Sequence, residues 1–314
     1  LPELRAAISD TLAREYDVRH AADEILTTTG GMEALHLAVL STVEPGSEVL
    51  LPSPSWPNYW TQAKLADATP IEVPMPAPDY DLDADTLIAE LTEDTSLVIL
   101  CSPSNPTGRV ADPDEVRAVV DAAAEHDAYV IADEVYAKLT YDREPTGIAA
   151  LTGHPDHVLT VGSCSKTYAM TGWRVGWLAG DSTVVDEATK VRESTTACTG
   201  SVAQHAAIAA LTGPQAPVEE MYDAFRERRD YVAGRLSDMD DVTAPEPEGA
   251  FYAFLNPDTD EASLPLAKRL CEEAGVVLAP GDGFGEAGQG QLRLSFANSM
   301  ERLEEGLDRL ERAL

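Results

Sequence analysis

Residues 163–176 read SCSKTYAMTGWRVG and place one lysine, Lys166, among small, hydroxylic and aromatic neighbours. The chain has only five lysines, so few residues compete for a role that needs an amine. A lysine that forms a Schiff base must be held at a fixed distance from a phosphate site. The hydroxyl of Ser163 and the guanidinium of Arg174, eight residues after the lysine, can supply such a site. The alternative is a solvent-exposed surface lysine, and these neighbours fit it poorly.

Further blocks carry residues with chemical uses: residues 29–35 (TGGMEAL), 52–56 (PSPSW), 102–108 (SPSNPTG), 133–136 (DEVY) and 291–296 (QLRLSF). Together with the lysine segment, and in their order along the chain, they resemble the class I and II aminotransferases, which depend on pyridoxal 5'-phosphate. The resemblance covers nearly the whole chain. It implies the α/β fold of the aspartate-aminotransferase type: a large mixed, mostly parallel sheet flanked by helices, plus a smaller α+β C-terminal domain.

The resemblance implies a first phosphate loop that contains Gly30, Gly31 and Met32. Independently of the family, glycines let a ligand approach the backbone closely, and a helix N-terminus favours an anion. Two glycines before a helix also occur without any ligand. The family often has a hydroxyl residue at the position of Met32, so we expect that side-chain contact to be lost. Ser163 and Arg174 complete the expected phosphate site.

The resemblance also assigns four residues to the cofactor ring. Trp56 would stack on the pyridine ring, although a half-buried core tryptophan would look the same in the sequence. Asn105, in a turn bracketed by prolines, would donate from its amide to the phenolic oxygen, and Tyr136 would reach the same oxygen. Asp133 would keep the ring nitrogen protonated, which makes the cofactor an effective electron sink.

Arg293 lies in a strand-like segment where the family carries the arginine that binds the substrate α-carboxylate. A planar guanidinium pairs with a carboxylate through two parallel hydrogen bonds, and a surface salt bridge is the alternative for any single arginine. Asn105 is assigned to the substrate site as well. The catalytic residues that the resemblance implies are Lys166, Asp133 and Tyr136, with amino transfer through a Lys166 aldimine. No metal site is predicted.

Short apolar runs rich in Val, Ile and Leu alternate with helix-like stretches, a pattern typical of strands that crossover helices bury on both faces. The expected strands are residues 48–51, 71–73, 97–101, 129–132, 158–161 and 175–179. The expected helices are residues 32–43, 113–125 and a long region from Thr183 past Arg235 that breaks near Gly213 and Pro214. The chain also opens directly into a helix.

After about residue 240 the pattern changes. The expected elements there are a Pro-rich connection at residues 244–248, a strand at 250–255, a helix at 264–273 and a closing amphipathic helix from Met300. We therefore expect a large cofactor-binding domain, residues 1–240, and a small C-terminal domain, residues 241–314. Family members usually carry several dozen residues before the block that resembles residues 1–5. The expectation is either a trimmed chain or a protein without the contacts which that segment makes.

The formal charge is −33, from 55 acidic and 22 basic residues spread along the chain. This balance argues against nucleic-acid binding, which needs a clustered basic face. Dispersed acidity with few lysines is typical of a protein in a very salty cytosol, where screening removes most self-repulsion; an ordinary acidic protein is the alternative. No apolar stretch is long enough for a membrane span and no basic leader occurs, so we expect a cytoplasmic protein. The four scattered cysteines predict reduced thiols.

The sequence therefore predicts an aminotransferase that moves an amino group from an L-amino acid to a 2-oxo acid. The resemblance implies a homodimer with active sites at its interface. One alternative is a β-lyase, decarboxylase or synthase on the same fold. Another is a non-catalytic ligand-sensing domain, as in regulators that carry an aminotransferase-like domain behind a winged helix. The acidity and the absence of a basic winged-helix sequence count against the sensor.

Overall fold

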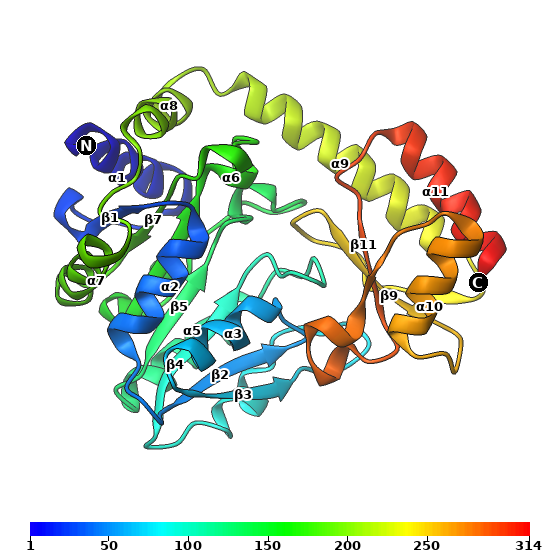
Figure 1. The fold of residues 1–314 in the computed structure, drawn as a ribbon, viewed down its shortest axis with the longest axis horizontal. Coiled ribbons are helices and arrows are strands. Elements are labelled where there is room, and N and C mark those ends of the chain that lie inside the picture. Colours follow the sequence, from blue (N-terminus) through cyan, green and yellow to red (C-terminus); the bar gives the residue numbers. More distant parts are fainter.

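The computed structural model describes residues 1–314 and contains two sheets, each covered by helices (Figure 1). The larger sheet has seven strands in the order β1-β7-β6-β5-β4-β2-β3. They are β1 (Ile25–Thr28), β2 (Glu48–Ser53), β3 (Thr69–Pro74), β4 (Thr95–Cys101), β5 (Tyr129–Asp133), β6 (Val158–Ser163) and β7 (Gly176–Ala179). The pairs from β3 to β6 are parallel, whereas β7 is antiparallel to both β6 and β1. The predicted mixed, mostly parallel sheet is confirmed.

The larger sheet has an apolar cluster on each face, because successive apolar side chains of its central strands point to opposite faces. In β4, Val98 and Leu100 belong to one cluster, while Leu97 and Ile99 belong to the other. The first cluster includes residues of α1 (Pro2–Tyr16), α4 (Ala84–Ile88), α5 (Pro113–Glu125) and α8 (Ser201–Thr212). The second includes residues of α2 (Gly31–Thr42), α3 (Pro57–Leu65) and α7 (Ser182–Thr195). The apolar runs in the sequence thus correspond to strands covered by helices on both faces.

The smaller sheet has four antiparallel strands in the order β10-β11-β9-β8. They are β8 (Val242–Thr243), β9 (Tyr252–Pro257), β10 (Ala279–Pro280) and β11 (Leu292–Ser295). The helices α9 (Ala216–Ser237), α10 (Ser263–Arg269) and α11 (Met300–Ala313) contribute to a third apolar cluster with these strands. Figure 1 shows α9 running from the side of the larger sheet to the smaller one. Its C-terminal residues Val232 and Leu236 are buried in that third cluster.

One prediction of local structure needs correction, and one strand of the larger sheet was missed. The long helical region after Thr183 is three helices, because residues 196–200 form a second break in addition to the predicted one near Gly213. Strand β1 was not predicted, since two of its four residues are threonines and its apolar run is only Ile25 and Leu26. None of the helices combines the length and the apolar character that a membrane crossing requires.

Candidate active site

A cleft of about 500 Å³ lies between the two sheets and is lined by residues from both. All the site residues predicted from the sequence line it except Gly30, whose backbone lies against Arg174. They are Gly31, Met32, Trp56, Asn105, Asp133, Tyr136, Ser163, Lys166, Arg174 and Arg293. Most of them come from the carboxyl ends of strands of the larger sheet or the start of α2, and Arg293 comes from β11. In open α/β sheets, ligands bind at this end of the strands.

One end of the cleft is built for an anion. Gly30 precedes α2 with φ 86°, and no side chain caps the first turn of this helix, so the N–H groups of Gly31 and Met32 stay available to a ligand. A Cβ at Gly30 would collide with the guanidinium of Arg174. That guanidinium donates to the carbonyl oxygens of Thr171 and Thr29 at 2.8 and 3.4 Å. The α2 N-terminus and Arg174 therefore present positive charge to the same part of the cleft.

Ser163 and Ser165 lie beside this anion site, and the sequence analysis named only the first. The Ser163 hydroxyl accepts from the Ser165 backbone N–H at 3.1 Å and thereby caps the short helix α6 (Cys164–Thr167). It also lies 2.9 Å from the Ser165 hydroxyl and 3.1 Å from the carbonyl oxygen of Val175. Because its hydroxyl is used within the loop, Ser163 positions the lysine-bearing segment, and Ser165 is a further candidate for the anion.

Lys166 extends from α6 into the cleft, where its Nζ lies 5.6 Å from the ring centre of Tyr136 and 5.3 Å from that of Phe251. It forms no ion pair. Burial and the charge of Arg293 lower the pKa of Lys166; Asp133 acts in the opposite direction, and Arg174 lowers it further. An amine with a lowered pKa is more often unprotonated at neutral pH, which is the form that attacks a carbonyl group.

Asp133 is buried at the end of β5, and its carboxylate accepts a hydrogen bond of 2.6 Å from the hydroxyl of Tyr59. The backbone N–H of Val135 donates to the other carboxylate oxygen at 3.3 Å. Burial raises the pKa of Asp133, while the Tyr59 hydrogen bond lowers it. A cationic nitrogen next to this carboxylate would favour its charged form. Tyr59 was missed by the sequence analysis, although it follows Trp56 by three residues and their rings meet edge to face.

The opposite wall of the cleft is a stack of aromatic rings around Arg293. The guanidinium carbon of Arg293 lies 4.4 Å from the ring centre of Tyr252 and 4.7 Å from that of Phe284. One of its nitrogens donates to Oδ1 of Asn105 at 2.7 Å. Burial lowers the pKa of Arg293, although it stays a strong base. The Nε of Arg293 is buried and has no partner within the chain, so the guanidinium retains a free donor.

Asn105 and Tyr136 lie next to this arginine. The hydroxyls of Tyr136 and Tyr252 are 3.1 Å apart, and burial raises the pKa of Tyr136. Since Oδ1 of Asn105 accepts from Arg293, the amide nitrogen of Asn105 remains a donor. Tyr252 was missed by the sequence analysis, because nothing in its local sequence marks it.

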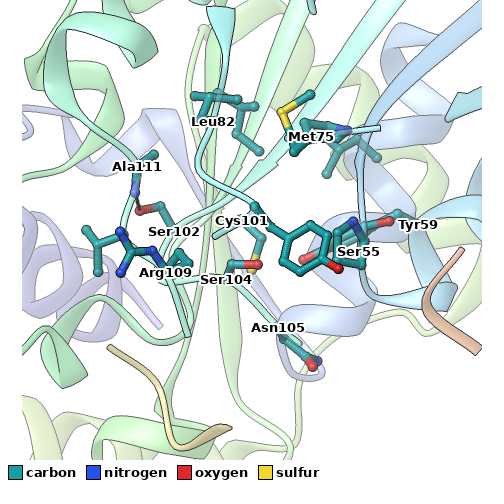
Figure 2. A pocket seen from close by; sticks show the side chains of 16 residues that line it. Ser55, Tyr59, Met75, Leu82, Cys101, Ser102, Ser104, Asn105, Arg109 and Ala111 are labelled. Atoms are coloured by element: carbon teal, nitrogen blue, oxygen red, sulfur yellow. Dashed lines mark hydrogen bonds between the residues drawn. The ribbon is translucent and has the colours of Figure 1, made fainter. Parts of the chain in front are cut away.

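A smaller cavity of about 60 Å³ adjoins the cleft. Figure 2 shows Tyr59 and Asn105 on its wall, together with Met75, Leu82 and Cys101. Burial raises the pKa of Cys101, so its thiol stays protonated and packs as a small apolar group.

The cleft residues fit pyridoxal phosphate on three observations. The uncapped start of α2 and Arg174 suit a phosphate group. The buried carboxylate of Asp133 suits a protonated pyridine nitrogen, and the indole of Trp56 offers an apolar face. The amine of Lys166 lies in the same cleft, within reach of an aldehyde.

Known proteins resemble this chain over its full length. The family model for aminotransferase class I and II matches residues 1–310. An aspartate aminotransferase from Pyrococcus abyssi is 37% identical, with 100% of this chain and 82% of the relative covered. A putative aminotransferase from Bacillus subtilis, YugH, is also 37% identical over the same shares. The crystal structure of an aromatic aminotransferase from Pyrococcus horikoshii has a TM-score of 0.96 at 36% identity and covers 99% of this chain and 85% of that one.

A solved structure of Thermus thermophilus aspartate aminotransferase with maleate has a TM-score of 0.95 at 34% identity, covering 100% of this chain and 82% of that chain. Identity above 30% over nearly the whole chain, together with the shared fold and the geometry of the cleft, leaves one assignment. The chain belongs to the class I and II aminotransferases and is a pyridoxal-phosphate-dependent aminotransferase.

Proposed function

We propose that this aminotransferase moves an amino group from an L-amino acid to a 2-oxo acid, with Lys166 as the residue that binds the cofactor covalently and carries the proton. The observation that supports this role most directly is the position of Lys166. Its Nζ lies in the cleft next to the aromatic rings of Tyr136 and Phe251, and burial together with Arg293 lowers its pKa. An amine in this state accepts a proton from a neighbouring carbon acid and returns it.

The other cleft residues then have distinct tasks. Pyridoxal phosphate, when bound, supplies an electron sink for negative charge at the substrate Cα. Asp133 would accept a hydrogen bond from the ring nitrogen, and the α2 N-terminus with Arg174 would hold the phosphate. Arg293 would hold the α-carboxylate of the substrate through two parallel hydrogen bonds. Asn105, which already bonds to Arg293, would donate from its amide nitrogen to the cofactor or to the substrate.

Product analysis tests the reaction. We expect the purified protein, supplied with pyridoxal phosphate, an amino donor and 2-oxoglutarate in high salt, to form equal amounts of glutamate and of the 2-oxo acid of the donor. Aspartate, alanine and phenylalanine are the first donors to screen, because the relatives are named aspartate, alanine and aromatic aminotransferases. Release of ammonia with pyruvate, or of carbon dioxide, would instead point to a lyase or decarboxylase on the same fold.

We also propose a homodimer in the cytoplasm, with domain limits at residues 1–240 and 241–314. The limits are supported by the end of α9 at Ser237 and the start of the smaller sheet at Val242.

The dimer is what membership of the class I and II aminotransferases implies, and the exposed side chains of Trp173 and Val202 are candidates for its interface. The cytoplasm is supported by four cysteines that form no disulfide.

We predict that the protein needs molar salt. With 55 acidic and 22 basic residues, like charges must crowd on its surface. The Debye length grows from about 3 Å at 1 M salt to about 30 Å at 0.01 M, so repulsions that were screened begin to add at low salt. Melting temperature, activity and bound cofactor should therefore fall together on dialysis from molar potassium chloride into dilute buffer. A matched dilute buffer with sorbitol at the same osmolality is the control: sorbitol stabilises folded proteins without screening charge, so it should restore less of the melting temperature and activity than the salt does. Equal melting temperature and activity in dilute buffer and in molar salt would contradict the prediction.

A further inference from the structure

A small internal cavity lies beneath the segment that carries Lys166, and it shares Ser163 with the active-site cleft as a lining residue. It is bounded by α1 through Leu12 and Tyr16, by the segment after β5, by β6 and β7, and by the end of α6. Glu134, Thr160 and Trp177 all line it. Each of these three side chains is buried, with exposed fractions of 8%, 1% and 6%.

The strand register explains why these residues meet. Thr160 pairs with Ala132 of β5, and Gly162 pairs with Trp177 of β7, so these side chains point to the same face of the sheet. Glu134 follows Ala132 by two residues, and its backbone N–H donates to the carbonyl oxygen of Val161 at 3.0 Å. A Cβ at Gly162 would collide with the indole of Trp177. The glycine therefore lets the indole lie against β6, with its N–H beside the cavity.

Three fully buried polar atoms of residues that line this cavity have no partner within the chain. They are Oε2 of Glu134, Oγ1 of Thr160 and Nε1 of Trp177. The other carboxylate oxygen of Glu134 accepts from the backbone N–H of Ile148 at 2.6 Å, so the side chain is held in place. A buried polar group without a hydrogen bond costs on the order of 1–3 kcal/mol, and three such groups around one cavity are costly unless a common partner satisfies them.

The size and polarity of the cavity suit one small hydrogen-bonding molecule. Its volume is about 20 Å³. A polar cavity needs roughly 10–15 Å³ by this measure to hold a water molecule, which then makes about three hydrogen bonds. The indole N–H only donates, the threonine hydroxyl donates or accepts, and the glutamate oxygen accepts when ionised and can donate when protonated. These three groups match both lone pairs and one hydrogen of a water molecule.

We propose that this cavity is a built hydration site in which one water molecule bridges Glu134, Thr160 and Trp177. The site joins the segment after β5, which begins one residue beyond Asp133, to β6, which ends at Ser163 just before Lys166. The bridge thus ties the segment after β5 to the middle of β6 and to β7, next to the strand ends that position Asp133 and Lys166. This inference concerns the fold beneath the active site, so its tests do not depend on the identity of the substrate.

Glu134 also gives the site a dependence on pH. Burial raises the pKa of Glu134 to about 7; the hydrogen bond from Ile148 opposes the shift and the charge of Asp133 adds to it. Besides Asp133, the titratable groups around it are Tyr16 of α1 and Tyr168 after α6, and Glu15 and Arg14 lie near Tyr16. Burial raises the pKa of both tyrosines, so both stay neutral across the range in which Glu134 titrates.

A crystal structure of the protein at high resolution tests the water directly. We expect density for one water molecule within hydrogen-bond distance of Oε2 of Glu134, Oγ1 of Thr160 and Nε1 of Trp177. A cavity without density, or one closed by a side-chain rotation that pairs these atoms with each other, would overturn the proposal.

Matched threonine variants provide the second test. Thr160→Val keeps the shape of the side chain and removes one partner of the water, so the melting temperature should fall by roughly 2–4 °C. Thr199 is the control, because its hydroxyl is also buried without a partner but does not line this cavity. Thr199→Val should leave the melting temperature unchanged or raise it. Equal effects of the two substitutions would show that Thr160 has no partner in the cavity.

The third test follows Glu134 with pH. A carboxyl group whose pKa is raised on folding contributes stability below its unfolded pKa and loses that contribution as pH rises through its folded pKa. In this protein the window runs from about 4.5 to about 7. Glu134→Gln keeps the shape and cannot ionise, so its melting temperature relative to the wild type should rise across this window, by roughly 5 °C, and then level off. A constant difference between pH 4.5 and 8 would contradict the role of Glu134.

Discussion

Replacing Lys166 with alanine is expected to abolish covalent binding of pyridoxal phosphate and to lower kcat by at least about 10²–10⁴-fold. The reason is that Lys166 is the one amine in the cleft, whose other cations are the guanidinium groups of Arg174 and Arg293. Neither guanidinium loses its proton in the physiological range, so neither can replace an amine as nucleophile or base. The measurement is borohydride reduction of each protein with cofactor, followed by peptide mapping. The added mass should lie on Lys166 in the wild type and should be absent from the Lys166→Ala protein.

Lys190→Ala is the matched control for this prediction. Lys190 is exposed and forms a surface ion pair of 2.5 Å with Glu187, three residues before it on α7. Exposed pairs of this kind contribute little to stability, so this variant should keep its activity and its reducible cofactor. A Lys166→Ala protein that still fixes the cofactor on reduction would show that another lysine is the attachment site.

Much of the fold follows from local pattern, because strands buried on both faces need long apolar runs. Strand β4 and helix α5 illustrate this: one is a run of Leu, Val and Ile, and the other begins with Asp112 and Pro113. The Asp112 side chain caps this helix, since it accepts from the N–H of Asp114 at 2.8 Å. Features with a weak sequence signal were missed. One is the break at residues 196–200, where Ala197 takes a helix-ending conformation with φ 63° although alanine does not mark such a position.

The site was predictable where its residues sit in short blocks with turn-forming neighbours. Asp133 ends β5, and Asn105 and Lys166 lie in the short segments after β4 and β6, so the parallel strands bring all three to one edge of the sheet. Other residues of the cleft come from distant segments: Tyr59 lies 74 positions from its partner Asp133 in the sequence, and Tyr252 lies 116 positions from its partner Tyr136. No local signal marks Tyr59 or Tyr252, because only tertiary packing brings each to its partner: Tyr59 comes from α3 beside the larger sheet, and Tyr252 comes from β9 of the smaller sheet.

The second large effect is expected at Arg293, where substitution by alanine should raise the KM for every amino donor by tens to thousands of fold. Loss of a buried charge pair typically costs about 2–5 kcal/mol, which corresponds to that range. The cofactor should remain bound, since Arg293 comes from β11 and the proposed phosphate site comes from α2 and Arg174. Steady-state kinetics with several donors, together with the cofactor absorbance of each protein, measure both parts of this prediction.

One further variant separates the geometry of Arg293 from its charge, and a second serves as its control. Arg293→Lys keeps the charge but loses the planar group held between Tyr252 and Phe284, so its KM should lie between those of the wild type and the alanine variant. Arg117→Ala is the control, because Arg117 pairs with Asp114 on the surface of α5 and its loss should leave KM unchanged. If Arg293→Ala binds every donor as the wild type does, the α-carboxylate is held elsewhere. If it loses the cofactor as well, the aromatic stack around Arg293 supports the cofactor site, and the two functions are not separable in this chain.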